Sequence, residues 1–427
     1  MNLEVVNYGE FSAELHQSIH AQDRFPSNVS IEVTRRCPLT CAHCYNNLPM
    51  GDLEARNAEP TYAELCRMMD EMAAAGTLWV LFTGGEIFAR KDFLDIYTYA
   101  KQKGFIITLF TNATLITPEI ADYLAEWRPF AVEITLYGHT KETYEQLTGV
   151  AGSWEKCRRG VDLILERGLP LTLKTVVVTI NKHELFDMQQ YAKERGCDFR
   201  YDLLMSPRID CSKSPLAVRL TPEEVVEVEM QDPRRATEWH QFAEKFGGPV
   251  HIGEKTQGIY TCGGGFNDFA IHADGGMGIC VSSRQDTYDL KKGNFREGWD
   301  DFLGEIRAKP ITLLTKCVAC GIKGMCSMCP ANGELENENP EKPVDYLCQV
   351  AHLRAHVFGL EVAPHGDCEY CSAGHGYATL IESVTKLSAK KAQLALGVPV
   401  KSSKYLPVLG ASATADAFGG CGSCSMH

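Results

Sequence analysis

The sequence lacks the features that would assign it to a membrane, a secreted or a nucleic-acid-binding class. It has no run of about 18 apolar residues, which a membrane-spanning helix requires. Its first 20 residues carry three glutamates and no apolar core segment, so they do not resemble a secretory signal. Positive charge is also scarce, since 42 Lys and Arg against 55 Asp and Glu give a net charge of −13. General nucleic-acid binding needs a basic face. The sequence therefore predicts a cytoplasmic globular protein that binds neither membranes nor nucleic acids.

Cysteine, by contrast, is abundant, with 18 among 427 residues. In a small secreted chain this number would indicate disulfides, but in a long chain without a signal it favours metal binding. Three cysteines lie at 37–44, seven at 262–348 and four in the tail at 368–371 and 421–424. Four stand apart, and of these Cys66 and Cys157 fall in predicted helices, where we expect small buried hydrophobic side chains; the others are Cys197 and Cys211.

Short β-rich apolar runs alternate with helical patterns from about residue 29 to 205. Thr61 with Glu64 fits a capping box at the start of the first long helix. Such alternation predicts a parallel sheet with crossover helices, and chemistry at the carboxyl ends of the strands. The predicted strands are 29–34, 78–82, 106–110, 131–136, 171–179 and 198–203, and the predicted helices begin near residues 61, 93, 118, 153 and 183.

The second half of the chain has weaker periodicity. Thr221 and Pro222 predict the start of one helix. Residues 262–348 are rich in Gly and Cys, so we expect metal to replace a hydrophobic core there. A further helix is predicted at 377–396, and the small-residue stretch 410–420 is expected to be flexible.

The first cysteine group, Cys37-x3-Cys41-x2-Cys44, directly follows the first predicted strand. Three thiolates this close can hold three corners of a 4Fe–4S cube. The fourth iron then has no protein ligand and is open to a substrate or cofactor. The spacing alone leaves two alternatives, a zinc site with His43 as the fourth ligand and three buried thiols.

Three strand-end segments add to this group. The second predicted strand ends in TGGE at 83–86, the third in TNAT at 111–114, and the fourth holds ITLYG at 134–138. Together with the CxxxCxxC spacing, and in this order, they resemble the signature, GGE and TNG segments of the radical S-adenosylmethionine (SAM) superfamily. The chain departs from that pattern at Ile87, where the family usually has Pro, and at Thr135 and Tyr137, where relatives often have Ser and an acidic residue.

The resemblance implies the cofactors and the reaction. An open iron of a 4Fe–4S cluster would chelate SAM, and one-electron reduction would release a 5′-deoxyadenosyl radical that abstracts a substrate hydrogen. Relatives often supply an Arg for the SAM carboxylate where this chain has Thr148, and Lys174 could supply the missing cation. The alternatives for Lys174 are a local ion pair or extension to solvent. The residues implied to contact SAM are Thr83, Gly84, Gly85, Glu86, Asn112, Thr135 and Lys174.

The second cysteine group resembles the SPASM domain of radical SAM enzymes that modify peptides and proteins. Its central run ends with two residues between Cys326 and Cys329, where three are usual. By position, the resemblance implies two auxiliary 4Fe–4S clusters, one on Cys317, Cys320, Cys326 and Cys348 and one on Cys262, Cys280 and Cys329. The latter set has three thiolates, so Asp268 is a fourth ligand or the iron stays open to a substrate thiolate. We favour the open site, since oxygen ligands are uncommon on such clusters. Two zinc ribbons are the alternative for the whole group.

The tail carries two CxxC pairs, Cys368 with Cys371 and Cys421 with Cys424. They could join as a further zinc or iron–sulfur site, form redox disulfides, or act as a segment that enters an active site. The ending GGCGSC at 419–424 resembles the small Cys-rich segments that such enzymes modify. A flexible tail without a catalytic role is the simplest alternative.

The sequence thus predicts an α/β fold, a partial (β/α)6 TIM-like barrel followed by a small SPASM domain. The expected divisions are a 1–24 N-terminal segment, a 25–207 radical SAM core, a 208–261 bridging region, a 262–350 auxiliary-cluster domain and a 351–427 extension.

With about 25 residues before the barrel, we expect a peptide or protein substrate to be recognised without a leader or through a separate leader-recognition protein. Electrons would come from a flavodoxin- or ferredoxin-type donor. The expected product is a thioether, a carbon–carbon crosslink or an oxidised side chain, and no catalytic side chain is assigned. The alternatives are a formylglycine-forming sulfatase maturase and, in another class, a non-enzymatic iron–sulfur electron carrier.

Overall fold

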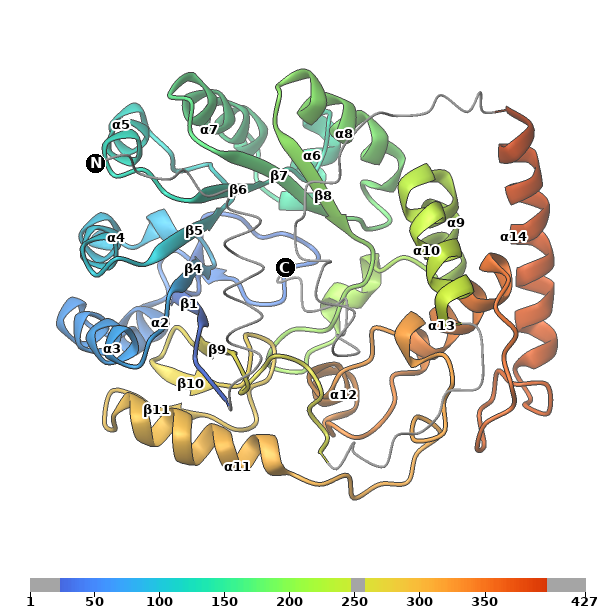
Figure 1. Cartoon of the computed structure of the whole chain (residues 1–427). Coiled ribbons are helices and arrows are strands. Elements are labelled where there is room, and N and C mark those ends of the chain that lie inside the picture. The colour runs from blue at the N-terminus through green and yellow to red at the C-terminus, as the bar shows by residue number, and fades with distance from the viewer. Residues whose placement is uncertain (1–23, 247–257, 398–427) are drawn as a thin grey trace, which may run out of the picture.

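The computed structural model describes residues 24–246 and 258–397. Its centre is a curved sheet of nine strands in the order β11-β10-β9-β1-β4-β5-β6-β7-β8 (Figure 1). The six strands from β1 to β8 in that order are parallel to their neighbours. They are β1 (Asn28–Thr34), β4 (Trp79–Gly84), β5 (Ile106–Thr111), β6 (Ala131–Thr135), β7 (Leu171–Val176) and β8 (Asp198–Asp202). This arrangement confirms the predicted partial barrel.

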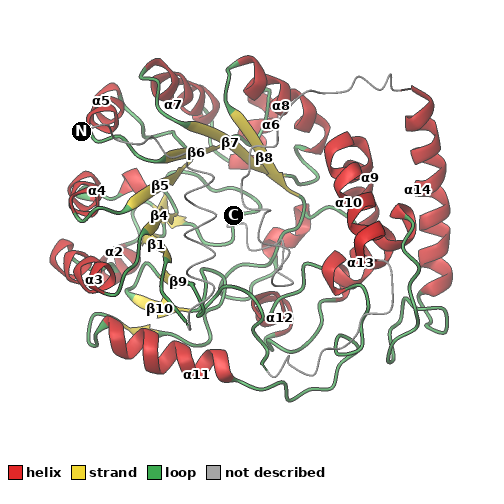
Figure 2. Ribbon diagram, in the orientation of Figure 1, coloured by secondary structure: helices red, strands yellow, loops and turns green. Residues whose placement is uncertain are grey.

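Helices that follow these strands cover the outer face of the sheet (Figures 1 and 2). They are α3 (Tyr62–Ala74), α4 (Phe93–Gln102), α5 (Pro118–Glu126), α7 (Ser153–Glu166) and α8 (Leu185–Glu194). The predicted capping box is present, because the Thr61 hydroxyl accepts from the Glu64 N–H and the Glu64 carboxylate accepts from the Thr61 N–H. Two short helices, α2 (Leu53–Ala58) and α6 (Lys141–Thr148), were not expected from the sequence.

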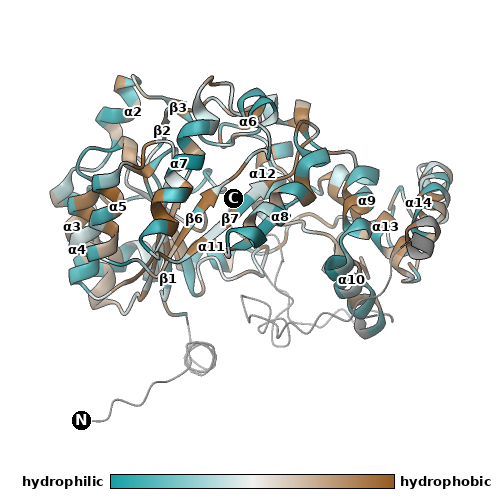
Figure 3. Cartoon of the chain, turned by 90° about the horizontal axis from the view of Figure 1, so that it is seen from above, coloured by the Kyte–Doolittle hydropathy of each residue, from teal (hydrophilic) through white to brown (hydrophobic). Residues whose placement is uncertain are grey.

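The two faces of β1 are both buried but differ in chemistry. Val29, Ile31 and Val33 are at most 3% exposed and belong to the hydrophobic core. Ser30, Glu32 and Thr34 alternate with them and are buried as well, as expected for a parallel strand that is covered on both faces. The helices turn their apolar sides inward and their polar sides outward, as the hydropathy colouring shows (Figure 3). The predicted strand 171–179 is too long, since β7 ends at Val176.

The cysteine-rich segment extends the same sheet. Strand β9 (Asp268–Ile271) pairs in parallel with β1, and β10 (Gly276–Gly278) and β11 (Tyr288–Asp289) add antiparallel strands at that edge. Phe269, Met277 and Trp299 are buried in the same hydrophobic core as β1. The expectation that metal replaces a hydrophobic core throughout 262–348 is therefore wrong. The prediction failed because the large apolar residues of this segment are separated by glycines and follow no regular period, so the sequence shows no strand or helix pattern.

The remaining helices form two groups. A π-helical turn (Glu297–Phe302) leads into α11 (Leu303–Ala308), and α12 (Pro330–Asn337) lies below the open side of the barrel (Figure 1). A layer beside the barrel contains α9 (Pro222–Gln231), α10 (Pro233–Phe246), α13 (Asp345–Phe358) and α14 (Tyr377–Gly397). The helices predicted at Thr221 and at 377–396 are confirmed as α9 and α14, whereas α10 and α13 were not predicted.

Short elements complete the described chain. A separate two-stranded ladder pairs β2 (Arg36–Cys37) with β3 (Leu48–Pro49). Short 3-10 helices span Ile87–Ala89, Lys182–Glu184, Ser214–Val218 and Lys323–Met325. Among the described residues, no helix is both long and apolar enough to cross a membrane. The predicted flexible stretch 410–420 and the pair Cys421 and Cys424 lie outside the described residues.

Candidate functional site

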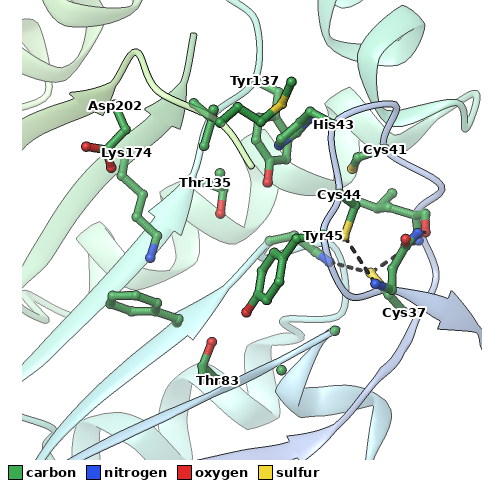
Figure 4. Close-up of a pocket in the computed structure, with 18 of the residues that line it drawn as sticks. Cys37, Cys41, His43, Cys44, Tyr45, Thr83, Thr135, Tyr137, Lys174 and Asp202 are labelled. Carbon is green, nitrogen blue, oxygen red and sulfur yellow. Dashed lines mark hydrogen bonds between the residues drawn. The ribbon is translucent and has the colours of Figure 1, made fainter. Parts of the chain in front are cut away.

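A pocket with an empty volume of about 1080 Å³ opens at the carboxyl ends of the parallel strands. One wall is the loop after β2, and the opposite wall is formed by β5, β6 and β7 (Figure 4). Ser282 and Leu335, from the cysteine-rich segment and α12, also line it. The pocket brings together Cys37, Cys41, Cys44, Thr83, Gly84, Gly85, Asn112, Thr135 and Lys174.

The three cysteines of the first group face this pocket from one loop (Figure 4). The Cys37 sulfur accepts hydrogen bonds from the Asn112 side-chain amide at 3.4 Å and the Leu39 N–H at 3.5 Å, and the Cys44 sulfur accepts one from the Asn47 N–H at 3.2 Å. Such bonds stabilise a thiolate and tune the potential of an iron–sulfur cluster. Burial raises the pKa of all three thiols, that of Cys37 to about 12. A bound cation is what would hold them as thiolates.

The spacing of the three sulfurs separates a cluster from a single ion. In the described part of the chain, one group of Cys, His and carboxylate side chains has its ligand atoms all within 4.8 Å of one another, and it is not this triad. A tetrahedral zinc ion would draw its ligands that close, whereas a four-iron cube holds its cysteines farther apart. The ring of His43 packs edge-to-face on Tyr137 with centroids 4.6 Å apart. Because the triad and His43 do not form such a tight group, the structure does not support the zinc alternative.

Gly84 and Gly85, at the end of β4, allow this strand end to approach the end of β1 closely. A Cβ on Gly84 would lie 2.1 Å from the Thr34 carbonyl oxygen, and one on Gly85 would lie 2.4 Å from that of Arg35. Gly84 also has φ +138°, which favours glycine. The Gly85 N–H donates to the Thr34 carbonyl at 2.7 Å. These glycines are required by the close approach of two strand ends, and the same approach sets the position of the cysteine loop.

Glu86 differs from the other residues implied to contact SAM, because it does not line the pocket. Its buried carboxylate accepts hydrogen bonds from the Thr111 hydroxyl at 2.7 Å, the Asn112 N–H at 2.8 Å and the Phe88 N–H. Burial raises the pKa of Glu86 to about 7. Its contacts make Glu86 a positioning residue that fixes the end of β5, and with it the amide of Asn112 that reaches the Cys37 sulfur.

Lys174 projects from β7 into the pocket, across from the cysteine loop (Figure 4). Its ammonium lies over the Phe110 ring and 3.5 Å from the Glu133 carboxylate, which also pairs with Arg200. The Nζ atom has no hydrogen-bond partner among the described residues. Burial lowers the pKa of Lys174 well below its usual value. The local ion pair weighed from the sequence is thus present, and a contact between Lys174 and SAM stays a proposal.

The cysteines of the second group lie in two separate clusters, and Cys329 directly precedes α12. Cys317, Cys320, Cys326 and Cys348 are near enough for one thiolate to raise the pKa of the next, and burial, the larger cause, raises the pKa of Cys326 to about 12. Cys262 lies close to Cys280 and to the buried carboxyl of Asp268, whose pKa burial and then Cys262 raise to about 6. The ligand sets themselves remain proposals.

The comparison with known families decides the class. The family described as the radical SAM superfamily matches residues 31–192, which contain the cysteine triad and the strand ends of the pocket. This chain is a radical SAM enzyme. Radical SAM chemistry requires a 4Fe–4S cluster and SAM, and the pocket offers three thiols and a cradle of strand ends for them. A non-enzymatic electron carrier is therefore not supported.

Curated relatives fall into two groups. AdoMet-dependent heme synthase of Methanosarcina barkeri is 26% identical over 349 residues, 75% of this chain and 97% of that protein. PqqA peptide cyclase of Rhodopseudomonas palustris is 35% identical over 173 residues, 40% of this chain and 45% of that protein. The second alignment thus spans less than half of this chain and less than half of PqqA peptide cyclase.

Solved structures share the fold over most of the chain. Streptococcus suis SuiB bound to its precursor peptide SuiA has a TM-score of 0.61 at 18% identity, covering 82% of this chain and 83% of that chain. The enzyme anSMEcpe with bound AdoMet has a TM-score of 0.58 at 16% identity, covering 86% of this chain and 98% of that chain. Both likenesses confirm the α/β fold, a partial barrel followed by a cysteine-rich region.

Proposed function

We propose that this radical SAM enzyme modifies a peptide or a protein. The observation that carries the proposal is the composition of the pocket wall. Ser282, two residues after Cys280, and Leu335 of α12 line the same pocket as the cysteine triad. The residues around the proposed auxiliary ligands thus border the space where a substrate would meet the radical.

When bound, SAM and a reduced 4Fe–4S cluster supply a 5′-deoxyadenosyl radical that abstracts a substrate hydrogen. Cys37, Cys41 and Cys44 are the proposed cluster ligands, and Thr83, Gly84, Gly85, Asn112, Thr135 and Lys174 the proposed SAM contacts. The Asn112 amide orients the Cys37 sulfur, and the Lys174 ammonium offers a positive charge for the SAM carboxylate. Phe110, Val176 and Met205 give the pocket apolar walls that exclude water.

The peptide substrate class is supported by related proteins. The SuiB structure contains the precursor peptide SuiA, and an anSMEcpe structure contains the Cp18Cys peptide. The proposed auxiliary clusters are one on Cys317, Cys320, Cys326 and Cys348 and one on Cys262, Cys280 and Cys329, with Asp268 beside the latter set. An open iron in that set would bind a substrate thiolate, which makes a Cys-containing peptide the expected substrate. The division into 25–207, 208–261, 262–350 and 351–427 stays part of this proposal.

The first experiment tests the cofactor assignment. Anaerobically reconstituted enzyme is expected to hold about 12 irons per chain, and the triple variant C37A/C41A/C44A about 8, because one four-iron cluster is lost. The variant should form no 5′-deoxyadenosine from SAM and dithionite. The matched controls C66S and C197S should keep both iron and SAM cleavage. SAM cleavage by the triple variant would contradict the assignment of these ligands.

The second experiment tests the substrate class. The enzyme, and separately its C37A/C41A/C44A variant, is coexpressed with short Cys-containing reading frames that neighbour its gene. The expected result is a peptide that loses hydrogen atoms, seen by mass spectrometry, with the active enzyme and not with the variant. If none of these reading frames yields a modified peptide, the result argues against peptide maturation.

A second candidate function is supported by the length of one alignment. The match to AdoMet-dependent heme synthase spans 97% of that protein, and Fe-coproporphyrin III synthase is 34% identical over 187 residues. A tetrapyrrole side chain is therefore the alternative substrate. Incubation with Fe-coproporphyrin III, SAM and reductant tests it, and a SAM-dependent mass change of the porphyrin would favour this candidate over the peptide.

A further inference from the structure

Four potential metal ligands converge outside the pocket, between α13 and α14. His352 lies on α13, and His365, Cys368 and Cys371 lie on the connection to α14. All four residues are buried, with exposed fractions of 2%, 7%, 4% and 6%. Their ligand atoms all lie within 4.8 Å of one another. A metal site of Cys368 and Cys371 with Cys421 and Cys424 is one of the alternatives that the sequence leaves open, and it includes neither histidine.

Three of the six distances between these atoms match a tetrahedral site, and the other three are at most 4.8 Å. His352 Nε2 lies 3.5 Å from the Cys368 sulfur and 3.8 Å from the Cys371 sulfur, and His365 Nδ1 lies 3.4 Å from the Cys371 sulfur. Zinc–sulfur bonds of about 2.3 Å and zinc–nitrogen bonds of about 2.0–2.1 Å separate tetrahedral neighbours by about 3.5 Å. The four donors therefore surround a space of the size that one ion fills.

The orientation of His352 is that of a metal ligand. Its Nδ1 lies 2.8 Å from the Cys348 carbonyl oxygen, one helical turn earlier on α13. A hydrogen bond from Nδ1 to this oxygen leaves the lone pair of Nε2 directed at the two sulfurs. Ligating histidines usually donate their other ring N–H to a carbonyl or carboxylate in this way.

We propose that His352, His365, Cys368 and Cys371 bind one zinc ion. Two sulfur and two nitrogen donors at tetrahedral spacing select zinc. Two thiolates balance the charge of the ion, so the complex is neutral and suits a buried place. Four protein ligands leave no open position, so the site is structural. It is independent of the proposed reaction.

The zinc site fastens the connection 359–376, and with it α14, to the helix that carries Cys348. Neighbouring contacts reinforce this attachment. Lys316, next to Cys317, pairs with Glu369, and the Tyr370 hydroxyl donates to Asp345 at 2.7 Å. The ion would therefore hold the surroundings of Cys348, a proposed auxiliary-cluster ligand.

Metal analysis of the anaerobically purified full-length protein tests the site. We expect about one zinc per chain in addition to the iron. H352A and the double variant C368S/C371S should lose that zinc. H356Q, altered one turn later on the same helix, and C421S/C424S, altered in the tail, should keep it. Zinc that is absent from the wild type, unaffected by the first two variants, or lost from C421S/C424S would overturn the proposed ligand set.

Cobalt substitution gives a second readout that needs no variant and does not depend on activity. Protein produced with cobalt in place of zinc should show the absorption bands of tetrahedral thiolate-bound Co²⁺. A disulfide between Cys368 and Cys371 in the freshly isolated protein, detected by peptide mass spectrometry, would overturn the proposal. So would additional iron in place of zinc.

Discussion

Lys174 places a positive charge in the pocket that its neighbours compensate only in part. Its ammonium is buried, and its carboxylate neighbour Glu133 is shared with Arg200. A buried charge that is only partly compensated is costly, and an incoming carboxylate would reduce that cost. Thr148 stands where the resemblance implies an Arg for the SAM carboxylate, and it does not line the pocket, so Lys174 is the proposed cation for that group.

The variant K174M is therefore expected to bind SAM at least about tenfold more weakly, because it loses a charge-assisted hydrogen bond. Isothermal titration of the anaerobic enzyme with SAM measures this. Wild-type affinity should also fall as the pH rises, since burial lowers the pKa of Lys174 and the ammonium loses its proton early. The exposed K193M on α8 is the control, and equal affinities in all three proteins would show that Lys174 serves only its ion pair.

The direction in which the Glu86 carboxylate points could not be predicted from the sequence. The TGGE segment correctly marked the end of β4 at the pocket. It could not show that the carboxylate turns away from the pocket to accept hydrogen bonds from Thr111 and Asn112. Those partners lie about 25 residues further along the chain, and only the pairing of β4 with β5 brings them together.

At the scale of elements, the barrel was the predictable part. Strands β1, β4, β5 and β6 begin within one residue of their predicted starts, because each is a short run rich in buried β-branched and apolar residues that alternates with helical patterns. Strand β9 was not predicted, because it is short and pairs with β1 over a separation of 240 residues. Helix α13 was missed for another reason. Ten of its 14 residues are buried, among them the polar His352 and Arg354, so the helix shows little amphipathic periodicity.

The contact between the ends of β4 and β1 gives an element-scale prediction. In G85A the new methyl group would meet the Arg35 and Arg36 carbonyl oxygens at 2.4 and 2.6 Å. The strand end must move, and the cysteine loop after β2 moves with it. We expect G85A to lose at least about tenfold in SAM cleavage, because catalysis depends on positions at the ångström scale.

The matched control is G51A, because nothing lies within 4 Å of the Cβ position of Gly51. Production of 5′-deoxyadenosine per bound iron is the measurement, so that a lower yield of cluster is not mistaken for slower chemistry. If G85A and G51A cleave SAM at the same rate, the close approach of the two strands does not position the cysteine loop.

At the scale of the whole molecule, the cysteine-rich segment and the barrel are parts of one packed structure. Within the cysteine-rich segment, the Ser283 hydroxyl and the Arg284 N–H donate to Glu334 of α12. Arg284 also reaches into the barrel, where it pairs with Glu32 of β1 at 2.8 Å. We infer that the two regions unfold together.

Removing this cross-connection should be costly. The Glu32 side chain is 0% exposed, and its other hydrogen bond comes from Asn46 at 2.7 Å. R284M would leave a buried carboxylate without its cation, which typically costs about 3–5 kcal/mol.

The exposed pair of Arg296 and Asp300 offers the control, since R296M should cost less than about 1 kcal/mol. Denaturant unfolding followed by both tryptophan fluorescence and iron–sulfur absorbance measures the effect. R284M should shift both signals together to lower denaturant. A shift confined to one signal would mean that barrel and cysteine-rich segment unfold separately.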